Sequence, residues 1–125
     1  MLLTTAFLLF LCIGVTYNVL LNQSSSESQV YGEPVVILCE ASGYDFTGYS
    51  LAWLKHVPGR ELVYIGHIYP SNGDTRITDS FSLRFQLQTN NTKNMGYMKI
   101  TSVQYEDAAV YYCAHIEKIF WYSSH

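Results

Sequence analysis

Two cysteines, Cys39 and Cys113, constrain this chain more than any other feature, because a disulfide between them would tie distant segments into one domain. A third cysteine, Cys12, lies in an apolar amino-terminal stretch that we expect to be removed. The remaining even pair is most simply explained as one disulfide formed in an oxidising compartment. Closing a loop of about 75 residues would stabilise the fold by roughly 4 kcal/mol.

The amino-terminal stretch from Met1 to Val15 is nearly all apolar. It has the length of a signal-peptide core and is shorter than the roughly 20 residues of a membrane span. We expect a signal peptide at 1–16, and the alternative is a short signal anchor, since no Lys or Arg precedes the apolar run. No second long apolar run follows, so we expect no permanent membrane span and a secreted or cell-surface location.

Beyond this stretch, short apolar segments recur about every ten residues between Gly, Ser, Asn and Pro, which is typical of a β-sandwich or barrel. We expect an all-β domain with strands at 35–39, 51–55, 62–68, 81–87, 95–100 and 110–113. Alternation of Phe81, Leu83, Phe85 and Leu87 with polar residues indicates a half-buried strand, and Asn72-Gly73 predicts a hairpin turn.

Composition excludes several classes of function. A chain of 125 residues that is 49% hydrophobic fits one domain, and 14% charged residues with a net charge of -3 disfavour nucleic-acid binding. Four scattered histidines lack the spacing of a metal site, and we expect them at the surface or in an interface. Without a phosphate-binding loop or nucleophile motif, we expect no enzyme activity and no cofactor. Eleven tyrosines favour recognition instead.

The order and spacing of Cys39, Trp53 and the run from Glu106 to Cys113 resemble those of an immunoglobulin V-set domain. The resemblance is closest to the heavy-chain variable region of antibodies, and the domain that it implies spans 17–114. It implies a Greek-key sandwich of two antiparallel sheets.

Four positions have structural roles by this resemblance. Trp53 would pack beside the disulfide, and Tyr111 would form the tyrosine corner that bonds back to the upstream backbone. Arg84 and Asp107 would form the salt bridge that closes one end of the sandwich. These residues would hold the fold and bind no ligand.

The resemblance implies hypervariable loops at 43–50 and 68–75, which would contact antigen. Their composition suits adaptable hydrogen bonding around rigid aromatic anchors, although ordinary polar turns share it. The expected contact residues are Tyr44, Asp45, Thr47, Tyr49, Ser50, Tyr69, Ser71, Asn72 and Asp74.

Heavy-chain variable domains also pair with a second variable domain through one sheet. His56 stands where the family usually has Gln, and Tyr64 where it usually has Trp. These departures fit a divergent lineage, a T-cell receptor pairing or an unpaired receptor domain. The expected pairing residues are Leu54, His56, Leu62, Tyr64 and Tyr112.

The segment 115–125 departs most from the family, whose last strand begins with Phe or Trp, Gly, any residue, Gly. No glycine follows Cys113 in this chain. We expect the last strand to be missing or non-standard, and 115–125 to be a truncated or readthrough tail. The hypothesis is a germline V segment without its joining segment.

The sequence therefore predicts an antigen-recognition variable domain of an immunoglobulin heavy chain, with antigen and a light or receptor chain as partners. The alternative is the V-set ectodomain of a T-cell, innate or adhesion receptor that binds a cell-surface ligand, and a third is a non-functional germline segment. Asn22 and Asn90 begin candidate N-glycosylation sequons, which could equally be unmodified polar turns.

Overall fold

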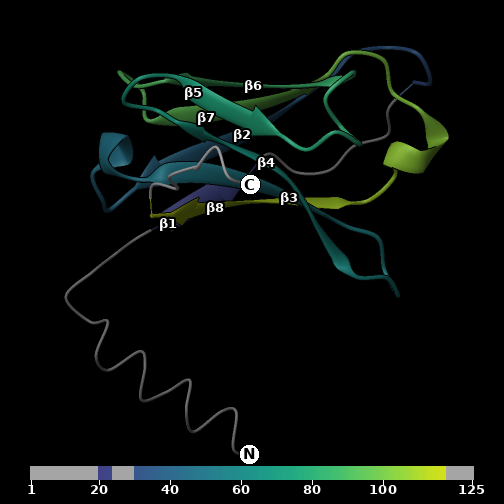
Figure 1. Ribbon diagram of the computed structural model, residues 1–125, viewed down its shortest axis with the longest axis horizontal. Coiled ribbons are helices and arrows are strands. Elements are labelled where there is room, and N and C mark those ends of the chain that lie inside the picture. Colours follow the sequence, from purple (N-terminus) through teal and green to yellow (C-terminus); the bar gives the residue numbers. More distant parts are fainter. Residues whose placement is uncertain (1–19, 24–29, 118–125) are drawn as a thin grey trace, which may run out of the picture.

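The computed structural model describes residues 20–23 and 30–117. These residues form two four-stranded antiparallel sheets, stacked face to face, and contain no α-helix (Figure 1). The prediction of an all-β immunoglobulin V-type sandwich is confirmed. Such stacking lets each sheet bury its apolar face against the other.

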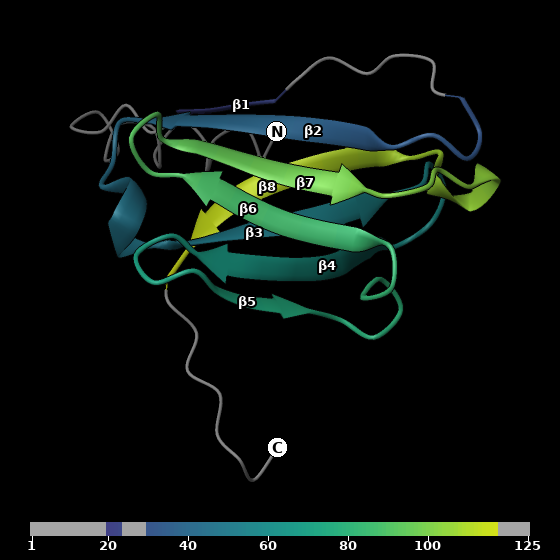
Figure 2. The same ribbon diagram turned by 90° about the horizontal axis from the view of Figure 1, so that it is seen from above.

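The first sheet has the strand order β1-β2-β7-β6, which Figure 2 shows from above. Its side chains alternate between core and solvent, as the two-residue period of a strand requires: Phe85 and Leu87 are buried, whereas Gln86 and Gln88 are exposed. The strands are β1 (Leu20–Gln23), β2 (Val35–Ser42), β7 (Met95–Ile100) and β6 (Phe85–Asn90).

The second sheet has the strand order β5-β4-β3-β8. The predicted hairpin turn joins β4 to β5, with Gly73 at a φ of 80° that favours glycine. Two short 3-10 helices, η2 (Phe46–Gly48) and η3 (Tyr105–Asp107), lie at opposite ends of the sandwich (Figure 1). The strands are β5 (Asp74–Ile77), β4 (Leu62–Tyr69), β3 (Ser50–His56) and β8 (Val110–Ile116).

The core lies between the sheets and is centred on the disulfide. Cys39 of β2 is bonded to Cys113 of β8, which links one sheet covalently to the other and confirms the predicted pair. Trp53 of β3 is fully buried in the same cluster. A Cβ atom added to Gly96 would lie 2.2 Å from Cδ2 of Leu51, so any larger residue here would have to displace that buried side chain.

The predicted strand at 81–87 is wrong in its first half. Turns occupy this part, with hydrogen bonds from Phe81 N to Thr78 O (2.9 Å) and from Phe85 N to Phe81 O (3.0 Å). Phe81 is half-buried, but Leu83 is 95% exposed, so the apolar alternation does not reflect one buried face. Local turn bonds satisfy the backbone here without a partner strand.

Strand β8 runs past Ala114, because its pairing with β3 continues through His115, opposite Leu51, to Ile116, opposite Ser50. The predictions for the signal peptide at 1–16 and for most of the tail, at 118–125, lie outside the described residues. Among the residues that the structure describes, no helix is long and apolar enough to cross a membrane.

Candidate functional site

One end of the sandwich is closed by the expected ion pair. Arg84 donates from Nη1 to Oδ2 of Asp107 (2.6 Å) and from Nη2 to Oδ1 (2.9 Å), a bidentate arrangement. The backbone N–H of Gln104 donates to the same carboxylate at 2.8 Å. The hydroxyl of Tyr111 donates to the backbone oxygen of Asp107 at 2.7 Å, which is the bond expected of a tyrosine corner.

The electrostatics of this end favour both charges. Burial alone would raise the pKa of Asp107, but the hydrogen bonds from Arg84 and Gln104 outweigh it and leave the pKa below its ordinary value. The bond to Asp107 raises the pKa of Arg84. Burial also raises the pKa of the Tyr111 hydroxyl. The end is therefore a satisfied polar cluster with a structural role.

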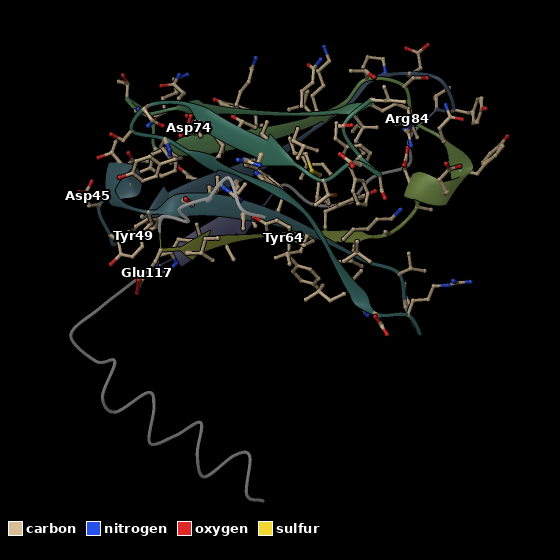
Figure 3. The ribbon with its side chains drawn as sticks, in the orientation of Figure 1. Asp45, Tyr49, Tyr64, Asp74, Arg84 and Glu117 are labelled. Atoms are coloured by element: carbon tan, nitrogen blue, oxygen red, sulfur yellow. A yellow bond between two sulfur atoms is a disulfide. The ribbon has the colours of Figure 1, made fainter. Side chains whose placement is uncertain are left out.

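The first predicted loop lies at the opposite end, where Asp45 and Tyr49 project, away from Arg84 (Figure 3). The Asp45 side chain caps η2 by accepting from Thr47 N (3.2 Å) and Thr47 Oγ1 (2.9 Å). Phe46 is 3% exposed and anchors the loop in the core. The cap and the buried ring thus stabilise this conformation of the loop.

Three rings, which we name the ring cluster, meet at this end: Tyr44, Tyr49 and His115. The ring centroids of Tyr44 and Tyr49 are 5.6 Å apart in an edge-on contact, and that of His115 lies 4.5 Å from Tyr44 and 5.0 Å from Tyr49. Burial raises the pKa of Tyr44 to about 12, whereas Tyr49 is 36% exposed. The cluster therefore combines a half-buried ring, Tyr44, with a ring that is accessible to a ligand, Tyr49.

Sequence reasoning placed His115 in a tail and missed its part in the cluster. The signal was present, because side chains two residues apart on a strand share a face, and His115 follows the inward-facing Cys113 by two. Its partners could not be found in this way, since Tyr44 and Tyr49 are contributed by a loop far away in the sequence.

The second predicted loop is a compact turn at the same end. Gly73 N donates to Tyr69 O at 2.8 Å, and Asp74 N donates to Asn72 Oδ1 at 2.9 Å. Ser71, Asn72 and Asp74 are exposed, whereas Tyr69 is half-buried. Figure 3 shows Asp74 at the same end as Asp45, Tyr49 and Glu117. The two predicted loops and the carboxyl end of β8 thus lie at the same end of the sandwich.

Ser50 is a correction to the predicted contact set. It is the first residue of β3, and its side chain is 1% exposed. The family resemblance placed it at the end of the first hypervariable loop, but pairing with Ile116 of β8 brings it into the sheet. Its side chain offers no surface to a ligand.

The five predicted pairing residues lie together on the side of the second sheet that faces away from the core, which we name the outer sheet face. Leu54 pairs with both Tyr64 and Tyr112, and His56 pairs with Leu62, so all five belong to neighbouring rows of one face. Leu62 is 57% exposed and Tyr112 is 43% exposed. The face is therefore exposed around Leu62 and Tyr112, and most of the five side chains are apolar or aromatic.

His67 also belongs to the outer sheet face, opposite Ala52, but it is only 4% exposed. The prediction of a surface or interface histidine is wrong for this residue. The Tyr64 hydroxyl forms a hydrogen bond with Nδ1 of His67. Burial lowers the pKa of His67, helped by the nearby charge of Arg76 and opposed by Asp74, and burial raises the pKa of Tyr64 to about 12.

The sequence matches the family model of the immunoglobulin V-set domain over residues 22–125. The chain belongs to this family. V-set domains are recognition modules that bind other proteins or domains, and they are typically extracellular. In this V-set domain, the described residues bring together no group of three or more His, Cys, Asp or Glu side chains that could hold a metal ion.

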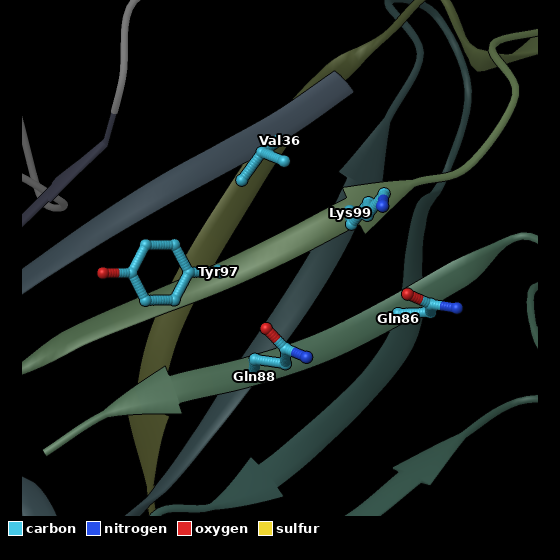
Figure 4. Close-up of a pocket in the computed structure, with 5 residues that line it drawn as sticks. All are labelled: Val36, Gln86, Gln88, Tyr97 and Lys99. Carbon is cyan, nitrogen blue, oxygen red and sulfur yellow. The ribbon is translucent and has the colours of Figure 1, made fainter. Parts of the chain in front are cut away.

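The V-set domain thus has two surfaces that suit recognition: the loop end with its ring cluster, and the outer sheet face. The solvent side of the other sheet carries a hollow of about 320 Å³, lined by three polar side chains, one aromatic ring and one valine (Figure 4). The lining residues are Val36, Gln86, Gln88, Tyr97 and Lys99.

Proposed function

We propose that this V-set domain is the antigen-recognition variable domain of an immunoglobulin heavy chain. It binds antigen through the loops at 43–50 and 68–75, and it pairs with a second variable domain through the outer sheet face. The observation that carries the proposal is the ring cluster, which joins the first loop to the carboxyl end of β8 in one accessible surface.

The ring cluster has the physical properties of a binding anchor. Aromatic side chains supply large contact area with few rotatable bonds, so little conformational entropy is lost when they contact a partner. Here the rings of Tyr49 and His115 already support each other, and η2 fixes the loop backbone. The exposed polar residues at 71–74 lie at the same end of the sandwich and supply hydrogen-bonding groups (Figure 3). The surface is therefore preorganised for recognition.

The outer sheet face supports the pairing part of the proposal. Interface cores are depleted of charged residues and enriched in aromatic ones. Leu62, Val110 and Tyr112 are exposed on this face, and Leu54 and Tyr64 lie between them in neighbouring rows. Covering such a face with a second variable domain would remove exposed apolar surface from water.

The alternative function is the ectodomain of a T-cell, innate or adhesion receptor that binds its ligand through the outer sheet face. The Tyr64–His67 hydrogen bond favours this candidate, because it gives the face a polar feature at one of the positions that depart from the heavy-chain pattern. In that case the ring cluster would stabilise the loop end without contacting the ligand.

The proposal is tested by joining the chain to a joining segment, pairing it with candidate light chains and selecting an antigen binder. Single replacements Tyr44→Ala, Tyr49→Ala and His115→Ala should each weaken binding by about 30-fold, the effect of losing a hot-spot side chain. Tyr105→Ala is the control, because Tyr105 is 82% exposed in η3 at the opposite end.

Affinity unchanged in all three ring variants would refute antigen recognition by the loop end. The charged replacements Leu62→Asp and Tyr112→Asp separate the two candidates, since both residues are exposed on the outer sheet face. In the receptor alternative they abolish ligand binding by the unpaired chain. In the heavy-chain proposal they abolish association with the second variable domain instead.

A further inference from the structure

The two candidate sequons, at Asn22 and Asn90, are far apart in the sequence, but their asparagines lie in one row of paired residues that runs across the first sheet. Asn22 of β1 pairs with Glu40 of β2, Glu40 pairs with Met95 of β7, and Met95 pairs with Asn90 of β6. The two asparagines therefore occupy the two edge strands at the same level. Three strand spacings of about 4.8 Å place their backbones about 14 Å apart.

The part of this row formed by Glu40, Met95 and Asn90 belongs to the solvent side of the sheet. The next row runs from Gln23 through Cys39 and Gly96 to Thr89, and Cys39 points into the core with 0% exposure. Adjacent rows of an antiparallel sheet face opposite sides. Glu40 is accordingly exposed. This part of the row is thus on the side that carries the hollow beside Tyr97 (Figure 4).

The local geometry at Asn90 leaves its amide nitrogen available. The side-chain oxygen of Asn90 accepts hydrogen bonds from Thr92 N (3.1 Å) and Lys93 N (3.3 Å), which holds the turn into β7. Within the described part of the chain, Nδ2 of Asn90 donates no hydrogen bond. Thr92, the hydroxyl residue of the sequon, is exposed. Modification of Nδ2 would therefore leave the turn intact.

We propose that Asn22 and Asn90 both carry N-linked glycans, and that the solvent side of the β1-β2-β7-β6 sheet is a glycan-covered face. The Cys39–Cys113 disulfide supports passage through the oxidising compartment in which both modifications are made. The inference holds for either candidate function, because it requires only that passage.

The chemistry is a group transfer from an oligosaccharide activated as a lipid diphosphate, which is the co-reactant. Nδ2 of asparagine forms a bond to the anomeric carbon of the first sugar, and the bond from that carbon to the diphosphate oxygen breaks. The electron pair of the broken bond leaves with the lipid diphosphate, and the amide loses one proton. No oxidant or reductant is needed.

Glycans in this row would cover the hollow. Gln88, which lines it, is two residues from Asn90 along β6, a distance of about 7 Å. Tyr97 pairs with Gln88 and lies in the same row of the sheet. With this side covered, the loop end and the outer sheet face would be left for protein partners.

The test is to express the full chain in secreting eukaryotic cells and to measure its intact mass with and without peptide N-glycosidase. The wild-type chain should carry two glycans. Ser24→Ala and Thr92→Ala should each lose one, and the double variant both. Gln23→Ala and Asn91→Gln are the matched controls, because they change the middle residue and keep each sequon. The proposal would be overturned if wild-type chain recovered from medium or membranes lacked a glycan at Asn22, at Asn90 or at both.

Coverage of the face is measured separately by labelling lysines with an amine-reactive reagent. Enzymatic removal of the glycans should increase the labelling of Lys99, which lines the hollow, relative to Lys55 in the other sheet. Equal relative labelling before and after deglycosylation would show that the glycans leave this side open and would overturn the covered-face inference.

Discussion

The neighbouring residues Tyr111 and Tyr112 of β8 point to opposite sides of the second sheet. Tyr111 is 9% exposed and donates its hydroxyl to the backbone oxygen of Asp107, whereas Tyr112 is 43% exposed on the outer sheet face. Because strand side chains alternate, one ring supports the fold and the next is available to a partner.

Replacement of Tyr111 by Phe should therefore lower the free energy of unfolding by about 1 kcal/mol, the value of a typical hydrogen bond. The matched control, Tyr112→Phe, should change it by less than about 0.5 kcal/mol, as is usual for an exposed position. Denaturant-induced unfolding of the two variants provides the comparison. Equal effects would contradict a structural role for the Tyr111 hydroxyl.

We expect His67 to give the stability of the domain a pH dependence. Its pKa is lowered in the folded state, mainly by burial, from the ordinary value of 6.5. The unfolded chain then binds more protons at this site, so stability is retained above that value and falls as the pH drops below it. The unfolding free energy of the wild type should begin to fall below about pH 6.5, the ordinary pKa of histidine. Between pH 7 and 5 this fall should be smaller in His67→Gln than in the wild type.

Chemical denaturation across this pH range measures the effect. His56→Gln on the same face is the control, and it should retain the pH dependence of the wild type. If His67→Gln and the wild type lose stability in parallel, a group other than His67 governs the acid response.

At the scale of elements, the two sheets approach closely where Gly96 of β7 faces Leu51 of β3. A methyl group at Gly96 would lie 2.2 Å from Cδ2 of Leu51, so Gly96→Ala must displace a fully buried side chain. We expect a loss of about 1–3 kcal/mol in unfolding free energy from overpacking. Thermal or denaturant unfolding measures the loss.

A double-mutant cycle with Leu51→Ala identifies its cause. Leu51→Ala removes the clashing atom, so the cost of Gly96→Ala should shrink or vanish in that background. An unchanged cost in both backgrounds would mean that backbone effects, and not the contact with Leu51, explain the loss.

At the scale of the whole molecule, one covalent bond joins the two sheets. The Cys39–Cys113 disulfide closes a loop with a sequence separation of 74. Its removal in the Cys39→Ala/Cys113→Ala variant should cost about 4 kcal/mol by the chain-entropy estimate, and the domain is then close to unfolding at 37 °C. Urea unfolding should show a lower midpoint for this variant than for the oxidised wild type.

The reduced wild-type chain is the control for this variant, since it lacks the bond but keeps both side chains. It should lose stability to a similar extent, and reductant should leave the double variant unchanged. A reduced chain as stable as the oxidised one would show that the core around Trp53 holds the sheets together without the disulfide.

Much of this architecture was predictable from the sequence, because its determinants are local or periodic. The alternation in β6 and the Asn72-Gly73 turn predicted an all-β chain. The spacing of Cys39, Trp53 and Cys113 carried the resemblance that implied two sheets, and the even number of cysteines predicted the bond between them. The segment at 81–84 misled the same reasoning, since its apolar alternation continues into turns where Leu83 faces solvent.

The features of the candidate site also differ in whether local sequence or tertiary packing determines them. By itself the sequence determined the all-β class, because hydrophobic period and turn chemistry act over a few residues. The two-sheet sandwich and the regions of the two loops were implied by the resemblance to the V-set family, and the disulfide by the even number of cysteines. Only the tertiary structure decided that His115 joins Tyr44 and Tyr49, that Ser50 and His67 are buried, and that Asn22 and Asn90 share a row. Each of these depends on strand register and packing between distant segments, which no short stretch of sequence contains.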